Sequence, residues 1–142
     1  MPFVGARILK VDLRSGITSR MEVPLDEQRA FLGAASLGAH LLYPGMQREA
    51  GLLDSDSPLL LLTGPLTGTA GPAVGRAVFC GRSPATGLWG ESNIGGFLGP
   101  KLRAAGFDGL WITGQAPEPV YVCSSQCASS VHAGVGQPGC WL

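Results

Sequence analysis

The fold is decided by the stretch from Pro58 to Pro72, which reads PLLLLTGPLTGTAGP. Its first part, from Leu59 to Thr63, is a short apolar run bounded by Pro58 and Gly64. A short run that is apolar on both faces is typical of a strand buried on both sides of a sheet. The rest is rich in glycine, proline and threonine, so we expect a loop directly after this buried strand.

Further strands and short helices are expected on both sides of this run. Two β-rich runs joined by a turn at residues 14–16 predict an N-terminal hairpin. Helical patterns then follow Asp26 and Glu27, whose charges favour a helix start, and Ser36, a good N-cap. The expected strands are residues 6–13, 17–23, 59–63, 73–80, 108–113 and 119–123, and the expected helices are residues 25–33, 36–43 and 95–105. This order predicts an α+β fold that is strand-rich, with a few short helices.

Prolines set limits on two of these helices. Pro44 and Gly45 should end the second helix, because proline lacks the backbone N–H that a helix interior needs. Pro100 has to lie in the first turn of the third helix, where that N–H has no partner in any case.

The composition excludes several classes of function. The chain has 142 residues, with 10 Lys and Arg against 10 Asp and Glu, and only 14% of its residues are charged. Such a chain has no broad field to hold nucleic acid or an anionic membrane, so we expect neither as a partner. Its longest apolar run is far shorter than the roughly 20 residues that span a bilayer, and its N-terminus lacks a secretory pattern. We therefore expect a cytoplasmic protein.

The four cysteines follow no strong metal-binding pattern. They are Cys80, Cys123, Cys127 and Cys140. Structural zinc sites usually show two close ligand pairs, whereas here only Cys123 and Cys127 are close in sequence. We therefore expect reduced thiols and no structural metal.

The C-terminal segment differs in composition from the rest of the chain. From Pro119 onward it contains no charged residue, and small residues and glycine dominate it. We expect the domain to span residues 1–122, and residues 123–142 to form a disordered or aberrant tail.

Three glycine-rich segments are candidates for a ligand site. The loop at residues 63–72 offers backbone N–H groups and three threonine hydroxyls. Arg76 stands beside Gly75, where its guanidinium can bind a phosphate or a carboxylate. Residues 89–96 lead into an expected helix start, and such starts bind anions.

Each of these features also has a plainer interpretation. A single glycine-rich segment is more often an ordinary turn, and none here matches a phosphate-binding loop or a dinucleotide fingerprint. Arg76 and Glu91 fit solvated surface charges, while His40 and Trp89 fit packed side chains.

Several rare strings occur together in one order. They are TGPLTGT at 63–69, GR at 75–76, SPATG at 83–87, WGESNIGG at 89–96 and GPKLRAAGFD at 99–108. In this order and spacing they resemble the N-terminal domain of aldehyde ferredoxin oxidoreductases, the tungsten or molybdenum bis-pterin enzymes with a [4Fe–4S] cluster. The resemblance covers about residues 5–122, including GARILKVDL at 5–13 and FLGAASLGA at 31–39.

This resemblance implies a β-sheet base on which the metal–pterin cofactor lies. By motif match, Arg76, Asn93 and Gly95 contact the cofactor and Gly96 lies close by, with Arg76 on a phosphate and the backbone of Asn93 near a magnesium ion. The resemblance also implies oxidation of an aldehyde to a carboxylic acid, ferredoxin as the electron acceptor, and a homodimer. It places no catalytic residue and no iron–sulfur ligand within this sequence.

Family members continue for several hundred residues beyond Val122, where the resemblance stops. We therefore expect a truncated cofactor-binding domain, and whether the chain alone is an enzyme stays open at this point. The alternative is a non-catalytic remnant or interaction fragment with the same fold. Metal and iron analysis of the purified protein distinguishes the two.

Overall fold

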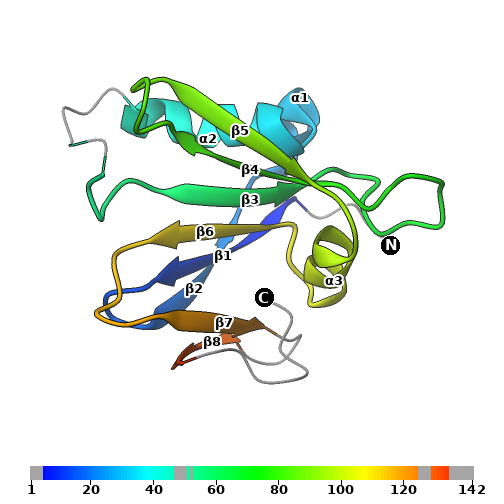
Figure 1. Cartoon of the computed structure of the whole chain (residues 1–142). Coiled ribbons are helices and arrows are strands. Elements are labelled where there is room, and N and C mark those ends of the chain that lie inside the picture. The colour runs from blue at the N-terminus through cyan, green and yellow to red at the C-terminus, as the bar shows by residue number, and fades with distance from the viewer. Residues whose placement is uncertain (1–4, 47–50, 52, 125–128, 135–142) are drawn as a thin grey trace.

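The apolar run becomes β3 (Leu59–Thr63), an inner strand of a six-stranded sheet. The computed structural model describes residues 5–46, 51, 53–124 and 129–134. The other strands of the sheet are β1 (Arg7–Asp12), β2 (Ile17–Glu22), β4 (Ala77–Arg82), β5 (Trp89–Ile94) and β6 (Gly109–Thr113). The strand order is β2–β1–β6–β3–β4–β5 (Figure 1). β1 and β6 run parallel, and the other neighbours run antiparallel.

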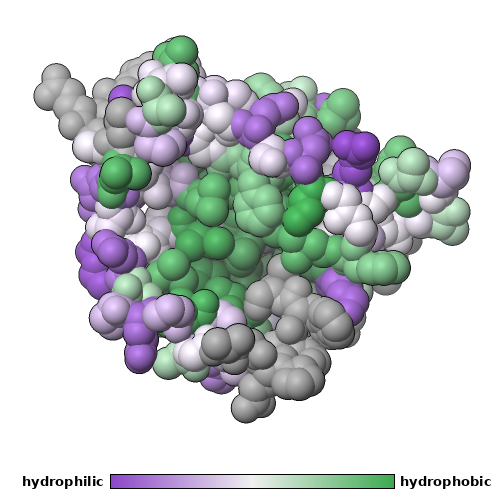
Figure 2. All heavy atoms as spheres, in the orientation of Figure 1, coloured by the Kyte–Doolittle hydropathy of each residue, from purple (hydrophilic) through white to green (hydrophobic). Residues whose placement is uncertain are grey.

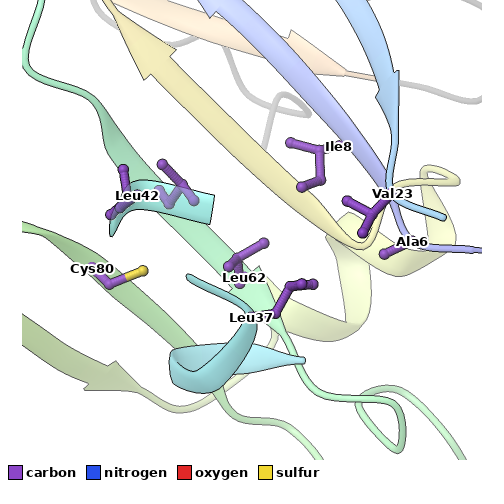
Figure 3. Close-up of a cluster of buried hydrophobic side chains, with 8 residues drawn as sticks. Ala6, Ile8, Val23, Leu37, Leu42, Leu62 and Cys80 are labelled. Carbon is purple, nitrogen blue, oxygen red and sulfur yellow. The ribbon is translucent and has the colours of Figure 1, made fainter. Parts of the chain in front are cut away.

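Two helices cover one face of this sheet. They are α1 (Leu25–Phe31) and α2 (Ala34–Met46), and α2 contacts β3 and β4. Because side chains alternate along a strand, Leu60 and Leu62 of β3 join the core on this face. Figure 3 shows Leu37 and Leu42 of α2 beside Leu62.

The opposite face carries α3 (Leu98–Ala104) and a two-stranded hairpin of β7 (Val120–Ser124) and β8 (Ser129–Ala133) (Figure 1). Leu61 of β3 points to this side and joins a second buried cluster with Leu102 of α3 and Val122 of β7. The hydroxyl of Thr18 in β2 donates to the carbonyl of Ser129 at 3.1 Å, which ties the hairpin to the sheet edge. Figure 2 shows apolar residues gathered in a hollow at the centre of this face.

The expected fold class is confirmed, since the described residues form an α+β domain rich in strands. The N-terminal hairpin and the doubly buried strand lie where they were predicted. Pro100 lies in the first turn of α3, as its chemistry requires. The second helix is longer than predicted: it begins at Ala34 and continues past Pro44 to Met46, because a proline near the last turn removes only one hydrogen bond.

Two strands were not predicted. β5 covers most of the glycine-rich segment at 89–96, which was interpreted as a loop, and it pairs with β4 along its whole length. β8 lies in the segment expected to be a disordered or aberrant tail. Within that segment, Ser129–Ala133 pairs antiparallel with β7. Cys127, Cys140 and the rest of residues 125–128 and 135–142 lie outside the described residues.

Gly109 allows β6 to lie between β1 and β3. A Cβ atom there would collide with the side chain of Leu62, would lie 3.1 Å from the carbonyl oxygen of Leu61, and would approach Ile8 at 3.4 Å. We expect Gly109→Ala to lower the free energy of unfolding by about 1–3 kcal/mol, the usual cost of overpacking a core. Urea unfolding measures this change.

Gly45→Ala is the matched control, because nothing lies within 4 Å of a Cβ atom at that position in α2. Its stability should be equal to that of the unmodified chain or slightly higher, since alanine is the better helix former. Equal stability of the Gly109→Ala variant would contradict the close packing of β6.

Candidate functional site

The loop at residues 64–76 connects β3 to β4 and is held in shape by Thr67. Its hydroxyl donates to the carbonyl of Arg76 at 2.9 Å and accepts from the backbone N–H of Gly64 at 3.0 Å. The N–H of Gly68 donates to the carbonyl of Val74 at 2.9 Å, which closes the loop a second time. The two ends of the loop are therefore fixed side by side.

The β4–β5 pair brings the predicted site residues together. Ala77 is the register partner of Ile94, and Val78 is the partner of Asn93. Arg76 directly precedes β4 and Gly95 directly follows β5, so antiparallel pairing sets them opposite each other. The side chain of Arg76 is exposed, and it forms no hydrogen bond or ion pair with the residues that the structure describes.

Glycines make the surface beside Arg76 flat. A Cβ atom on Gly75 would lie 2.8 Å from the carbonyl oxygen of Gly96, so the two backbone segments touch. Nothing lies within 4 Å of a Cβ position on Gly95 or Gly96, so both face open space. Gly96 has φ +82°, a conformation that glycine adopts without the strain of a side chain.

Exposed apolar side chains stand near this surface. Phe97 follows Gly96 directly and is 80% exposed, while Leu66 in the 64–76 loop is 66% exposed. Asn93 is also exposed, on the edge strand β5. One end of the β4–β5 pair therefore presents a cation, an amide, two bare glycines and an aromatic ring to the outside.

Sequence reasoning missed the residues that hold this site in place. The threonine hydroxyls were interpreted as groups offered to a ligand, but Thr63 and Thr67 are both buried. Arg103 of α3 donates from Nη1 to the carbonyl of Gly64 at 3.1 Å and pairs with Asp108 at 3.3 Å. The only signal in the sequence was the clustering of threonines after an apolar strand.

Other groups in the described part of the chain offer little chemistry of their own. No group of three or more His, Cys, Asp or Glu side chains there is placed to hold a metal ion. His40 stacks on Phe31 with ring centroids 4.0 Å apart, and its Nε2 lies 3.2 Å from a carboxylate oxygen of Glu27. None of the described helices is long and apolar enough to cross a membrane.

The sequence matches a family model described as "Aldehyde ferredoxin oxidoreductase, N-terminal domain" over residues 8–132. A tungsten-containing aldehyde ferredoxin oxidoreductase of Thermococcus kodakarensis is 35% identical over 116 residues, which cover 82% of this chain and 19% of that protein. An aliphatic sulfonate oxidoreductase, WOR-like subunit, of Pyrococcus furiosus is 33% identical over 121 residues, with 83% and 19% covered. This chain thus spans about a fifth of the length of these relatives.

A solved structure has the same fold. It is the active-site complex BamBC of benzoyl-coenzyme A reductase, in complex with 1,5-dienoyl-CoA. The TM-score is 0.86 at 27% sequence identity, and the match covers 90% of this chain and 20% of that one. The sheet and helices described above are therefore a shared structural unit.

Cys80 of β4 lies in the core and should be an inert thiol. Burial raises the pKa of Cys80 from 9.0 to about 11, and the nearby charge of Glu91 contributes to the same shift. Because the raised pKa keeps the thiol protonated at pH 8, the nucleophilic thiolate should be roughly a hundredfold rarer than at a thiol of ordinary pKa.

Alkylation with iodoacetamide at pH 8, located by mass spectrometry, measures this reactivity. Cys80 should stay unmodified in the folded chain and react once urea unfolds it. Equal rates in the two states would contradict the burial of this side chain.

Proposed function

The chain belongs to the aldehyde ferredoxin oxidoreductase family, and we propose that it provides the surface on which the tungsten–pterin cofactor of such an enzyme lies. One observation carries this proposal. Arg76, an exposed guanidinium without a partner among the described residues, stands opposite two open glycines at the end of the β4–β5 pair.

The residues present fit a flat, anionic group. A pterin is planar, so it needs a surface without side chains, and the open Cβ positions of Gly95 and Gly96 meet that need. Its phosphate needs a cation, and a guanidinium can donate two parallel hydrogen bonds to one phosphate. An exposed aromatic ring at Phe97 adds an apolar surface next to the two glycines.

Each residue then has its own role. Arg76 would neutralise and orient a cofactor phosphate, while Gly95 and Gly96 would let the ring system approach the backbone. Asn93 would offer its side-chain amide to the cofactor and its backbone to an associated magnesium ion. The bound cofactor supplies the redox chemistry, in which an aldehyde and water become a carboxylic acid, two protons and two electrons.

The names of the relatives support the proposal that this domain binds the cofactor and does not determine substrate specificity. Those names refer to aldehydes, to aliphatic sulfonates and to benzoyl-coenzyme A. A unit shared by proteins with such different substrates is better suited to bind what they have in common. The aldehyde substrate, the [4Fe–4S] cluster and the ferredoxin acceptor are therefore proposed for the whole enzyme, to which this chain would contribute one domain.

The alternative of a non-catalytic interaction fragment is not favoured. The family match over residues 8–132 and the 35% identity to a tungsten-containing relative favour a domain that holds the cofactor. The homodimer, the cytoplasmic location and the truncation of the family domain remain predictions.

Removal of the cation should weaken cofactor retention. We expect Arg76→Ala to lose a charge-assisted hydrogen bond of about 1.5–3 kcal/mol, which corresponds to roughly tenfold or more in affinity. Asn93→Ala should weaken the same site. Tungsten and pterin content per folded chain, in a complete family enzyme that contains this domain, measures the loss.

Arg20→Ala is the matched control, because Arg20 is an exposed arginine on β2, at the opposite edge of the sheet. Its cofactor content should not change. If Arg76→Ala and Asn93→Ala fold and retain full cofactor, the assignment of these residues is wrong.

Gly95→Val tests the flat surface separately from the charge. Because the Cβ position faces open space, the variant should fold normally and still exclude the cofactor by bulk. Gly51→Val is the control, since that position is equally open and lies in the segment before β3, whereas the site loop follows β3. Full cofactor content in Gly95→Val, measured in the same way, would exclude close approach of the ring system to this glycine.

A further inference from the structure

We propose that the hydroxyl of Thr67 positions Arg76 for the cofactor phosphate, an inference that rests on the proposed function. Thr67 does not face the outside, since only 5% of its surface is exposed. It acts through the backbone of Arg76, to whose carbonyl it donates at 2.9 Å. It is therefore a positioning residue.

One hydroxyl connects the two ends of the 64–76 loop. It accepts from the N–H of Gly64, the first residue after β3, and donates to the carbonyl of Arg76, the last residue before β4. The carboxyl end of β3 is itself fixed, because the N–H and hydroxyl of Thr63 both donate to the carbonyl of Asp108, at 2.9 and 2.8 Å. Thr67 thus connects the backbone of Arg76 to the rigid end of β3.

The rotamer of Thr67 is fixed by packing on α3. A Cβ atom on Gly99 would lie 2.9 Å from the methyl carbon of Thr67 and 3.3 Å from the carbonyl oxygen of Gly75. Thr67, Gly99 and Gly75 therefore form one tightly packed contact directly behind Arg76. With the methyl group held there, the hydroxyl is left to face the two backbone groups that it joins.

This support matters because the side chain of Arg76 is exposed and unpaired within the part of the chain that the structure describes. A long, unpaired side chain is placed chiefly by the backbone from which it starts. In a precisely oriented site, a displacement of a binding group by about 1 Å can lower the rate or the affinity by a large factor. Loss of the Thr67 hydroxyl should therefore weaken anion binding at Arg76 without any change to the guanidinium itself.

The experiment uses pyrophosphate as a probe for the phosphate groups and follows its titration into the full chain by NMR. Thr67→Val keeps the shape and removes the hydroxyl, Thr67→Ala removes the hydroxyl without adding bulk, and Thr67→Ser keeps the hydroxyl. Thr18→Val is the matched control: Thr18 is half-buried on β2, at the opposite edge of the sheet, and its hydroxyl also donates to a carbonyl, that of Ser129 at 3.1 Å.

We expect pyrophosphate affinity to fall roughly fivefold in Thr67→Val and Thr67→Ala, within the range of one neutral hydrogen bond. It should be retained in Thr67→Ser and in Thr18→Val, although Thr18→Val should unfold at a lower urea concentration. If the role of Thr67 is only structural, its variants should lower stability as Thr18→Val does and leave the affinity unchanged.

Two outcomes overturn the inference, and they are distinguishable. If Arg76→Ala weakens pyrophosphate binding while Thr67→Val and Thr67→Ala bind as the unmodified chain does, Thr67 does not position Arg76 and the proposed function stands. If Arg76→Ala leaves binding unchanged, the phosphate role of Arg76 fails, and the inference about Thr67 fails with it.

Discussion

Asp108 is the junction on which the arrangement of this domain depends. Its backbone N–H donates to the carbonyl of Arg7 at 2.7 Å, and its carboxylate accepts from the N–H of Arg7 at 2.9 Å. Its carbonyl accepts twice from Thr63, and its carboxylate pairs with Arg103. One residue thus joins the start of β1, the end of β3 and helix α3. A buried or half-buried polar group that lacks a hydrogen-bond partner destabilises the fold. The hydrogen bonds of Asp108 therefore hold β1, β3 and α3 together.

The site residues take their positions from this junction. Arg103, held by Asp108, also donates to the carbonyl of Gly64, and Thr67 carries the connection from Gly64 to Arg76. The β4–β5 pairing then sets Gly95 opposite Arg76. A continuous set of short polar contacts therefore runs from the centre of the sheet to its outer corner. Loops built in this way are rigid without a metal or a disulfide, which suits a surface that has to match a planar ligand.

Local patterns in the sequence predicted the elements that bury a clear face, and they failed where a strand is polar. β3 could be predicted because all of Leu59–Leu62 is apolar, and the N-terminal hairpin because its turn is short. β5 and β8 were missed because Trp89–Ile94 includes exposed polar residues and Ser129–Ala133 is rich in serine. Such strands are defined by their backbone pairing to a neighbour, which a local window of sequence does not contain. The parallel pairing of β1 with β6 joins segments about 100 residues apart and is equally invisible locally.

The family resemblance identified the candidate site residues, and the fold shows how they lie relative to one another. In the sequence Arg76 and Asn93 belong to two separate glycine-rich segments, whereas in the fold Arg76 directly precedes β4 and Asn93 lies on its partner strand β5, at the same end of the pair. Two of the three threonines, Thr63 and Thr67, were noticed for the wrong reason, because their side chains are buried and hold the loop, whereas Thr69 is exposed. Buried hydroxyls and exposed ones look identical in a sequence, since the difference lies in the groups that surround them.

Residues with strained backbone conformations also lie in or next to the 64–76 loop. The non-glycine residues with positive φ in the described part of the chain are Leu32 at 61°, Ala34 at 51° and Ala73 at 58°. Ala73 lies in the 64–76 loop, and Leu32 and Ala34 flank Gly33, where a Cβ atom would lie 3.0 Å from the carbonyl oxygen of Thr63 and 3.4 Å from Pro65. Each such conformation costs about 1–3 kcal/mol and persists only where tertiary contacts impose it. The close packing of Gly33 on Thr63 and the hydrogen bond from Gly68 to Val74 hold these two segments in place. A loop already held in its binding shape loses less entropy when a ligand binds. Strain, buried threonines and open glycines are therefore three parts of one preorganised surface.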